Sequence, residues 1–153
     1  MIWAEKEVPS LELCRRLKEL GFPQESSDSG WYWGIRNYQR ELLFCNHSQV
    51  TLWIKYHQEE LGYREIIKAP TLREILEWLP YFIEAESKIL KRTTSYYLYF
   101  QKLGKDFYKV YYKWEYNEYY QIIPEGCIEA DINNACVKML IWLAENGYVK
   151  FKE

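Results

Sequence analysis

The stretch that decides the fold of this chain is Tyr96–Tyr120, which reads YYLYFQKLGKDFYKVYYKWEYNEYY. It holds nine tyrosines, two phenylalanines and one tryptophan in 25 positions, with lysines set among them. Aromatic residues at this density either fill a sheet-based core or form a surface on which other molecules pack. The alternation of the residues therefore has to show which rings point inward.

The stretch is predicted to form a β-hairpin that turns at Leu103-Gly104-Lys105. Two registers are open. A two-residue turn at Gly104-Lys105 pairs Tyr99 with Val110, mixes aromatics on both faces and buries lysines on one of them. A three-residue loop pairs Leu98 with Val110 and separates the lysines from the core. We favour the second register, because burying an unpaired lysine costs several kcal/mol.

This register divides the hairpin into two faces. The face without lysines is predicted to be core and consists of Leu98, Phe100, Tyr108, Val110, Tyr112 and Trp114. The opposite face is predicted to point outward, with rings beside ammonium groups, and consists of Tyr97, Tyr99, Gln101, Phe107, Lys109, Tyr111 and Lys113. Six of these outward residues form the expected binding surface: Tyr97, Tyr99, Phe107, Lys109, Tyr111 and Lys113.

Three helices are signalled by their caps and by apolar residues at helical spacing. The first is predicted from Ser10 to Leu20. The second begins at Thr71, where Thr71-Leu-Arg-Glu74 forms a capping box, and ends before Pro80. The third follows Asp131 and ends at Gly147.

Alternating apolar and polar residues predict strands over 31–35, 42–45 and 50–57, besides the two strands of the hairpin. Residues 81–94 fit either a loose helical turn or a loop. The expected architecture is a single α+β domain over residues 1–153, in which about three helices pack on a mostly antiparallel sheet of about five strands, as two layers or a sandwich.

The length and composition fit this expectation. The chain has 153 residues, 48% of them apolar and 27% charged, which is ordinary for one globular domain. The net charge of −2 excludes a strong overall attraction to nucleic acid or acidic lipid. However, residues 88–113 hold seven basic residues against one acid, a local charge of +6.

The sequence predicts a cytoplasmic protein that does not enter a membrane. No apolar run approaches the ~20 residues that a membrane helix needs, and the start, MIWAEKEVPS, lacks the basic region of a signal peptide. The four cysteines show no close pairing such as C-x-x-C, so we expect reduced thiols and no disulfides.

Catalytic and metal-binding motifs are weak. The chain contains no G-x-S-x-G, P-loop or H-E-x-x-H motif, so we expect that it is not an enzyme. Cys45-x-His47 with His57 could supply three zinc ligands, but Cys45 and His57 lie on different predicted strands and no fourth ligand supports them. We therefore expect no metal and no cofactor.

The outward face allows two functions. Tyrosine is a favoured anchor of protein interfaces, so contact with a protein partner or self-association is the first interpretation. The second is binding of single-stranded nucleic acid, in which Tyr97, Tyr99 and Tyr111 stack on bases. Lysines would then contact the phosphates: Lys109 and Lys113 on the face, and Lys102 and Lys105 at the turn.

Four segments carry a resemblance to a known group of proteins: residues 9–24 (PSLELCRRLKELGFPQ), 31–33 (WYW), 69–80 (APTLREILEWLP) and 130–147 (ADINNACVKMLIWLAENG). In this order they resemble small uncharacterised proteins encoded by bacteriophages and by integrated elements of bacteria. The resemblance implies a phage or bacterial cytoplasmic context and a compact α+β fold. It implies no activity, because the family has none established.

Overall fold

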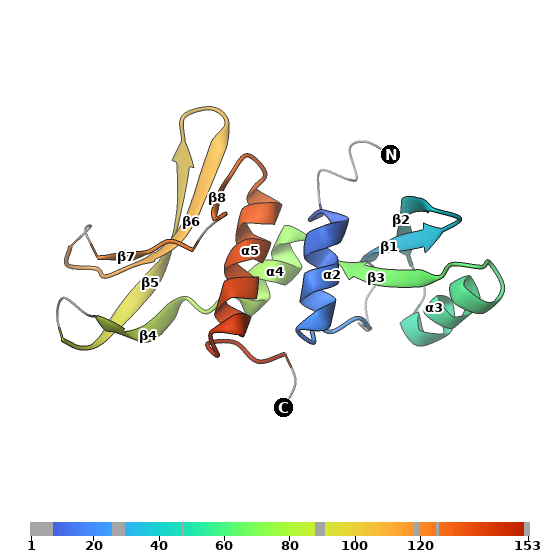
Figure 1. Cartoon of the computed structure of the whole chain (residues 1–153), viewed down its shortest axis with the longest axis horizontal. Helices are drawn as coiled ribbons and strands as arrows, with labels where there is room; N and C mark the ends of the chain where they lie inside the picture. The colour runs from blue at the N-terminus through green and yellow to red at the C-terminus, as the bar shows by residue number, and fades with distance from the viewer. Residues whose placement is uncertain are drawn as a thin grey trace. The chain divides into compact units, whose positions relative to one another are not determined.

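Figure 1 shows a computed structural model of the chain, which describes residues 8–25, 30–46, 48–87, 91–117, 120–124 and 126–151. These residues form four helices and two antiparallel sheets, one of three and one of five strands. The α+β class is confirmed, but there is one helix more than predicted and two sheets replace the single one. The chain divides into an N-terminal unit, residues 1–74 with 151–153, and a C-terminal unit, residues 75–150.

The sheet of the N-terminal unit has β1 (Gly30–Arg36) at its centre, between β2 (Gln39–Cys45) and β3 (Glu65–Ala69). A two-residue turn joins β1 to β2. Its residues Asn37 and Tyr38 have φ angles of 51° and 63°, as a type I′ hairpin turn requires. The strands predicted over 31–35 and 42–45 are confirmed.

Helix α2 (Leu11–Glu19) confirms the first predicted helix. The Ser10 hydroxyl accepts a hydrogen bond from the Leu13 amide at 3.4 Å, as an N-cap should. The buried face of α2 packs with β1 and β3 in one apolar cluster: Val8, Leu11, Cys14, Trp33, Ile35, Ile67 and Ala69. The indole Nε1 of Trp33 donates to the Pro9 carbonyl at 3.1 Å and so connects β1 to the start of the helix.

The predicted strand over residues 50–57 is wrong, because this segment forms helix α3 (Val50–Glu59). Apolar residues at every second position suggested a strand, but the same residues also fit a helical stripe through Val50, Trp53 and Ile54. In the structure this helical stripe faces the core: Val50 is buried in an apolar cluster, and Trp53 and Ile54 pack against that cluster. Leu52, which the strand would have placed beside Val50 and Ile54, is 53% exposed.

A buried lysine marks the end of this sheet. Lys68, on β3, is 2% exposed. Its Nζ lies 3.1 Å from Oε2 of Glu74, in a geometry that is not a hydrogen bond, and 5.0 Å from the ring centre of Tyr32. Glu74 also accepts hydrogen bonds from the amide and hydroxyl of Thr71, which confirms the predicted capping box. A Cβ at Gly30 would lie 2.3 Å from the ammonium nitrogen, so the glycine leaves it room.

The sheet of the C-terminal unit has the order β4-β5-β6-β7, with β8 also paired to β6, and every neighbouring pair is antiparallel. The aromatic stretch forms its centre. The strands are β4 (Phe82–Ser87), β5 (Arg92–Leu103), β6 (Phe107–Lys113), β7 (Gln121–Ile122) and β8 (Ile128–Glu129).

Two helices follow the predicted caps. Helix α4 (Leu72–Trp78) begins after the capping box, and α5 (Ile132–Glu145) begins after Asp131, whose carboxylate accepts from the amides of Asn133 and Asn134. Helix α5 contacts β6 and β8. It presents eight buried residues, which makes it the most buried helix of the described chain.

The described residues among 81–94 form strands in place of the expected helical turn or loop, and residues 88–90 lie outside the described residues. The segment contains β4 and the start of β5, which pair from Phe82↔Tyr97 to Ser87↔Arg92. The local signal was the alternation of Ile83 and Ala85 with Glu84 and Glu86, since Ile83 is buried while both glutamates are exposed.

The predicted hairpin is present, but the register that we favoured for it is wrong. Leu98 pairs with Tyr112 and Phe100 with Val110, so the loop is Gly104-Lys105-Asp106 and the pairing is shifted by two residues from the favoured register. A shift of two preserves the face of every side chain, whereas a shift of one would exchange the faces. The division of the hairpin into two faces therefore survives the error in register.

We predict that Gly30→Ala lowers the free energy of unfolding by about 1–3 kcal/mol, because the added methyl group meets the buried Lys68 ammonium. Lys68→Met is the matched background, since it removes Nζ and leaves the Cε position, 3.7 Å from the new Cβ. In the Lys68→Met background, Gly30→Ala should change the free energy of unfolding only slightly. Urea denaturation of the four proteins in this double-mutant cycle measures the coupling. If Gly30→Ala lowered the free energy of unfolding equally in both backgrounds, the destabilisation would not come from contact with the Lys68 ammonium group.

Candidate interaction surface

The residues predicted to point outward share one face of the five-stranded sheet, which we call the outer face. Cross-strand pairing joins Tyr97 to Lys113, Tyr99 to Tyr111, and Gln101 to Lys109. Neighbouring strands extend this face: Phe82, Glu84 and Glu86 on β4, Gln121 on β7 and Ile128 on β8. The opposite face lies toward α5, because Ile132 at the start of this helix lines a hollow with Phe100 and Tyr108.

The centre of the outer face is a packed arrangement of two lysines and two tyrosines, which we call the lysine–tyrosine ladder. The Nζ of Lys109 lies 4.1 Å from the ring centre of Tyr111, and that of Lys113 lies 4.4 Å from the ring centre of Tyr99. The two rings stack at 5.8 Å. Lys109 also donates a hydrogen bond to Oε1 of Gln121 at 2.9 Å. Four of the six predicted site residues thus touch one another.

These contacts limit what the ladder can bind. Each tyrosine ring has a lysine ammonium group near its centre and the other ring stacked beside it, and Tyr111 is only 8% exposed although it points outward. Each cation–π contact is worth about 0.5–1 kcal/mol at an exposed site. A base that stacked on Tyr99 or Tyr111 would have to displace one of them.

A group of exposed rings lies where β4 adjoins β5. Tyr81 is 71% and Phe82 is 37% exposed. Both rings approach the half-buried Tyr97, at 6.2 and 5.9 Å between ring centres. Sequence reasoning included Tyr97 but missed Tyr81 and Phe82, because it did not recognise β4. The alternation along β4 was the signal that could have found Phe82.

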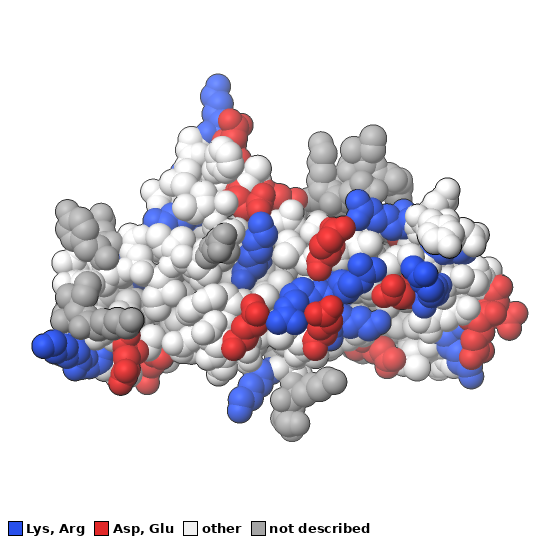
Figure 2. Space-filling model, in the orientation of Figure 1, with Lys and Arg blue, Asp and Glu red and all other residues white. Residues whose placement is uncertain are grey.

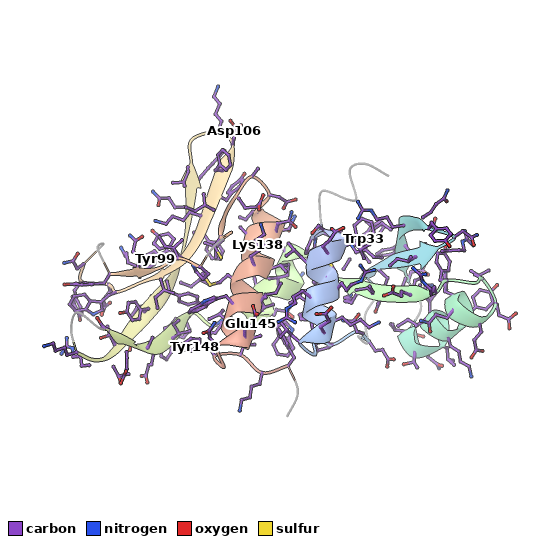
Figure 3. The ribbon with its side chains drawn as sticks, in the orientation of Figure 1. Trp33, Tyr99, Asp106, Lys138, Glu145 and Tyr148 are labelled. Carbon is purple, nitrogen blue, oxygen red and sulfur yellow. The ribbon has the colours of Figure 1, made fainter. Side chains whose placement is uncertain are left out.

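The remaining predicted site residue, Phe107, lies apart from this group. It pairs with Leu103 next to the hairpin loop and is 49% exposed. Figure 3 labels Tyr99 along β5 and Asp106 at the tip of the hairpin, where Phe107 begins β6. Phe107 therefore extends the outer face toward the tip without joining the ladder.

The predicted core face of the hairpin is only partly buried. Val110 and Tyr112 are 0% exposed, and the Tyr112 hydroxyl donates to the Pro80 carbonyl at 2.6 Å. Leu98, Tyr108 and Trp114 are half-buried, but Phe100, predicted to be core, is 47% exposed. The hairpin extends past the start of α5, so its outer end has no helix to cover it (Figure 1).

The charges of the outer face are distributed unequally. Glu84 and Glu86 lie on β4 at one side, and Lys109 and Lys113 lie on β6 toward the other. The rings stand between the acidic and the basic side. In Figure 2 the visible side of the C-terminal unit is mostly uncharged, with a few acidic and basic groups on it.

The buried thiols are unreactive at neutral pH. Burial raises the pKa of Cys14, Cys127 and Cys136 to about 12, so these thiols are protonated and poor nucleophiles at neutral pH. Cys45 is buried at the end of β2. Burial also raises the pKa of Tyr112.

The three residues weighed as zinc ligands are not brought together in the described part of the chain. His57 lies on α3, not on a strand, and its ring stacks on Trp53 at 3.9 Å. His47 falls outside the described residues. Within the part of the chain that the structure describes, no group of three or more His, Cys, Asp or Glu side chains is placed to hold a metal ion. No helix there is long and apolar enough to cross a membrane.

No protein-family model, curated protein or solved structure matches this chain at a significant level.

We predict that stability declines as the pH rises above about 9. An unfolded cysteine ionises with a pKa of about 8.5, whereas the folded thiols stay protonated to about pH 12. The unfolded state therefore binds fewer protons than the folded state in this range, and the free energy of unfolding falls with rising pH. Urea denaturation at pH 7 and pH 10 measures the change.

Thiol labelling separates this effect from the titration of other groups. At pH 8.5 the folded protein should react with an aromatic disulfide reagent only as fast as it opens. Tyr81→Cys provides an exposed control thiol on the same fold and should react at once. Fast labelling of Cys14, Cys127 or Cys136 in the folded protein would show that they are not buried as described.

Proposed function

We propose that the chain is a non-enzymatic accessory or interaction protein of phage or mobile-element origin, and that it acts by binding protein through the outer face. The observation that carries this proposal is the cluster of Tyr81, Phe82 and Tyr97 beside the lysine–tyrosine ladder, which no described element covers. Exposed aromatic groups of this kind are typical anchors of protein interfaces. The origin rests on the resemblance of the helix-forming segments.

The charge distribution favours a second copy of the chain as the partner. Two outer faces related by a two-fold axis parallel to the strands place the β4 of one copy over the β6 of the other. Phe82 of one copy then lies opposite Lys113 of the other, and Glu84 lies two residues further along, within reach of the Lys113 side chain; this contact occurs twice, whereas Lys109 lies toward the other end of the strands from both glutamates. Such a self-complementary surface is what a symmetric dimer requires.

We expect the protein to associate reversibly and Phe82→Ser to weaken association about ten-fold or more, because it removes an exposed ring from the contact. The matched control is Phe100→Ser, which changes the same residue type on the same sheet, 47% exposed but on the other face. Light scattering coupled to gel filtration, over a range of concentrations and salt, measures both. A monomer at all concentrations, or equal effects of the two substitutions, would contradict dimerisation through this face.

Single-stranded nucleic-acid binding is the second candidate, and the observation in its favour is the pair Lys109 and Lys113 beside the half-buried Tyr99 and the buried Tyr111 on the outer sheet face. It ranks second because the Tyr99 and Tyr111 rings are already occupied by these lysines and by each other.

Under the first proposal we expect oligo(dT) to bind no more tightly than about 10⁻⁴ M, the weak end of non-specific binding. Fluorescence anisotropy at physiological salt measures this. Micromolar binding would favour the second candidate if Lys109→Gln with Lys113→Gln abolishes it. Lys102→Gln with Lys105→Gln is the charge-matched control and should then have the smaller effect.

A further inference from the structure

Strand β5 is longer than its partner β6 and has an open edge. Lys113, the last residue of β6, pairs with Tyr97, so residues 92–96 of β5 pair only with β4 within the described chain. Beyond Lys113 the chain turns away from β5: the Trp114 amide donates to the Tyr120 carbonyl at 3.0 Å, and the Asn117 amide donates to the Trp114 carbonyl at 3.4 Å. Figure 1 shows β5 continuing past the end of β6 toward β4.

The main-chain groups of Thr93 and Ser95 point to this open edge. The Leu98 amide donates to the Tyr81 carbonyl, on the β4 side of β5. Successive residues of a strand direct their main-chain groups to opposite edges, and the β4–β5 register is continuous from Tyr97 to Arg92. Even-numbered residues therefore face β4, and the N–H and C=O groups of Thr93 and Ser95 face the side that β6 has left.

A hollow of about 250 Å³ lies where β6 would have continued, lined by residues 92–95, Tyr97 and residues 114–116. One wall carries the main-chain edge and the hydroxyl side chains of β5. The other wall is aromatic, with Trp114 held against Tyr116 at 5.2 Å and against Tyr120 at 5.4 Å between ring centres.

We propose that this edge is the docking site for an extended peptide segment of a partner protein, which adds to the sheet as a short strand beside residues 92–96. The recognising chemistry is main-chain hydrogen bonding to Thr93 and Ser95, together with a large apolar side chain of the peptide against Tyr97, Trp114 and Tyr116. A single extended segment brings no further strands with it and can lie in this hollow beside residues 114–116, whereas the edge strand of a second copy would bring its own sheet.

The edge is first tested by amide hydrogen exchange in the free protein. The amides of Thr93 and Ser95 should exchange fast, while those of Thr94 and Tyr96, which face β4, should exchange slowly. Slow exchange at Thr93 and Ser95 would show that the edge is already occupied, and would overturn the proposal.

Binding is then tested with a displayed library of random peptides about twelve residues long, selected on the wild-type protein. We expect synthetic copies of the selected peptides to bind Ser95→Pro about ten-fold or more weakly, because proline has no N–H to donate. Proline at this position leaves the hydrogen bonds between β5 and β4 intact, since the lost N–H points to the open edge and away from β4. Ser95→Ala is the matched control: it keeps the N–H and should bind as wild type does. Equal binding to Ser95→Pro and Ser95→Ala, or no enriched peptide, would overturn the proposal.

A second variant, Tyr116→Ala, tests the peptide site in case Ser95→Pro does not fold. Tyr116→Ala removes a ring that is 75% exposed, so it should fold normally and still weaken peptide binding. If Ser95→Pro does not unfold cooperatively, unchanged peptide binding by Tyr116→Ala overturns the proposal. Phe82→Ser, which acts on the outer face, should leave peptide binding unchanged. Tyr97 belongs to both sites, but Phe82 does not line the hollow, so this variant tests the outer face without removing a wall of the peptide site.

Discussion

Successive side chains of a β-strand point to opposite faces of the sheet, and the C-terminal unit depends on this constraint along β5 and β6. It sends Val110 and Tyr112 to the buried face and Lys109, Tyr111 and Lys113 to the outer face. Because lysines and rings alternate with inward residues, a slip of one position would bury two ammonium groups. The alternation thus selects the faces of the hairpin and, through the hairpin, those of β4, β7 and β8.

The outer face combines two kinds of surface. In the lysine–tyrosine ladder the ammonium groups lie over the rings, so contacts within the protein already use the ring faces and the positive charges. At the β4 side, Tyr81 and Phe82 have no such cover and supply free apolar area. The ladder is therefore better suited to orient a charged partner, and the β4 side to supply the contact energy.

The parts of the fold that sequence reasoning found are those with local signals. Ser10, Thr71 and Asp131 cap their helices as predicted, because capping involves residues within one turn. The faces of the hairpin were also found, because alternation is local. Helix α3 was missed, since its apolar residues fit both a period of two and a helical stripe. The six site residues do share one face, but the rings of Tyr81 and Phe82 were missed with β4.

The sequence by itself determined the α+β class, three helix starts and the two faces of the hairpin, because caps and alternation act over a few residues. Only the tertiary structure decided that the strands form two sheets, that Phe100 is exposed and that part of β5 pairs on one side only within the described residues. It also placed Lys68 in the interior, where Glu74, Tyr32 and the missing side chain of Gly30 accommodate its charge. Strand partners and burial depend on contacts between residues far apart in the chain, which no local pattern encodes.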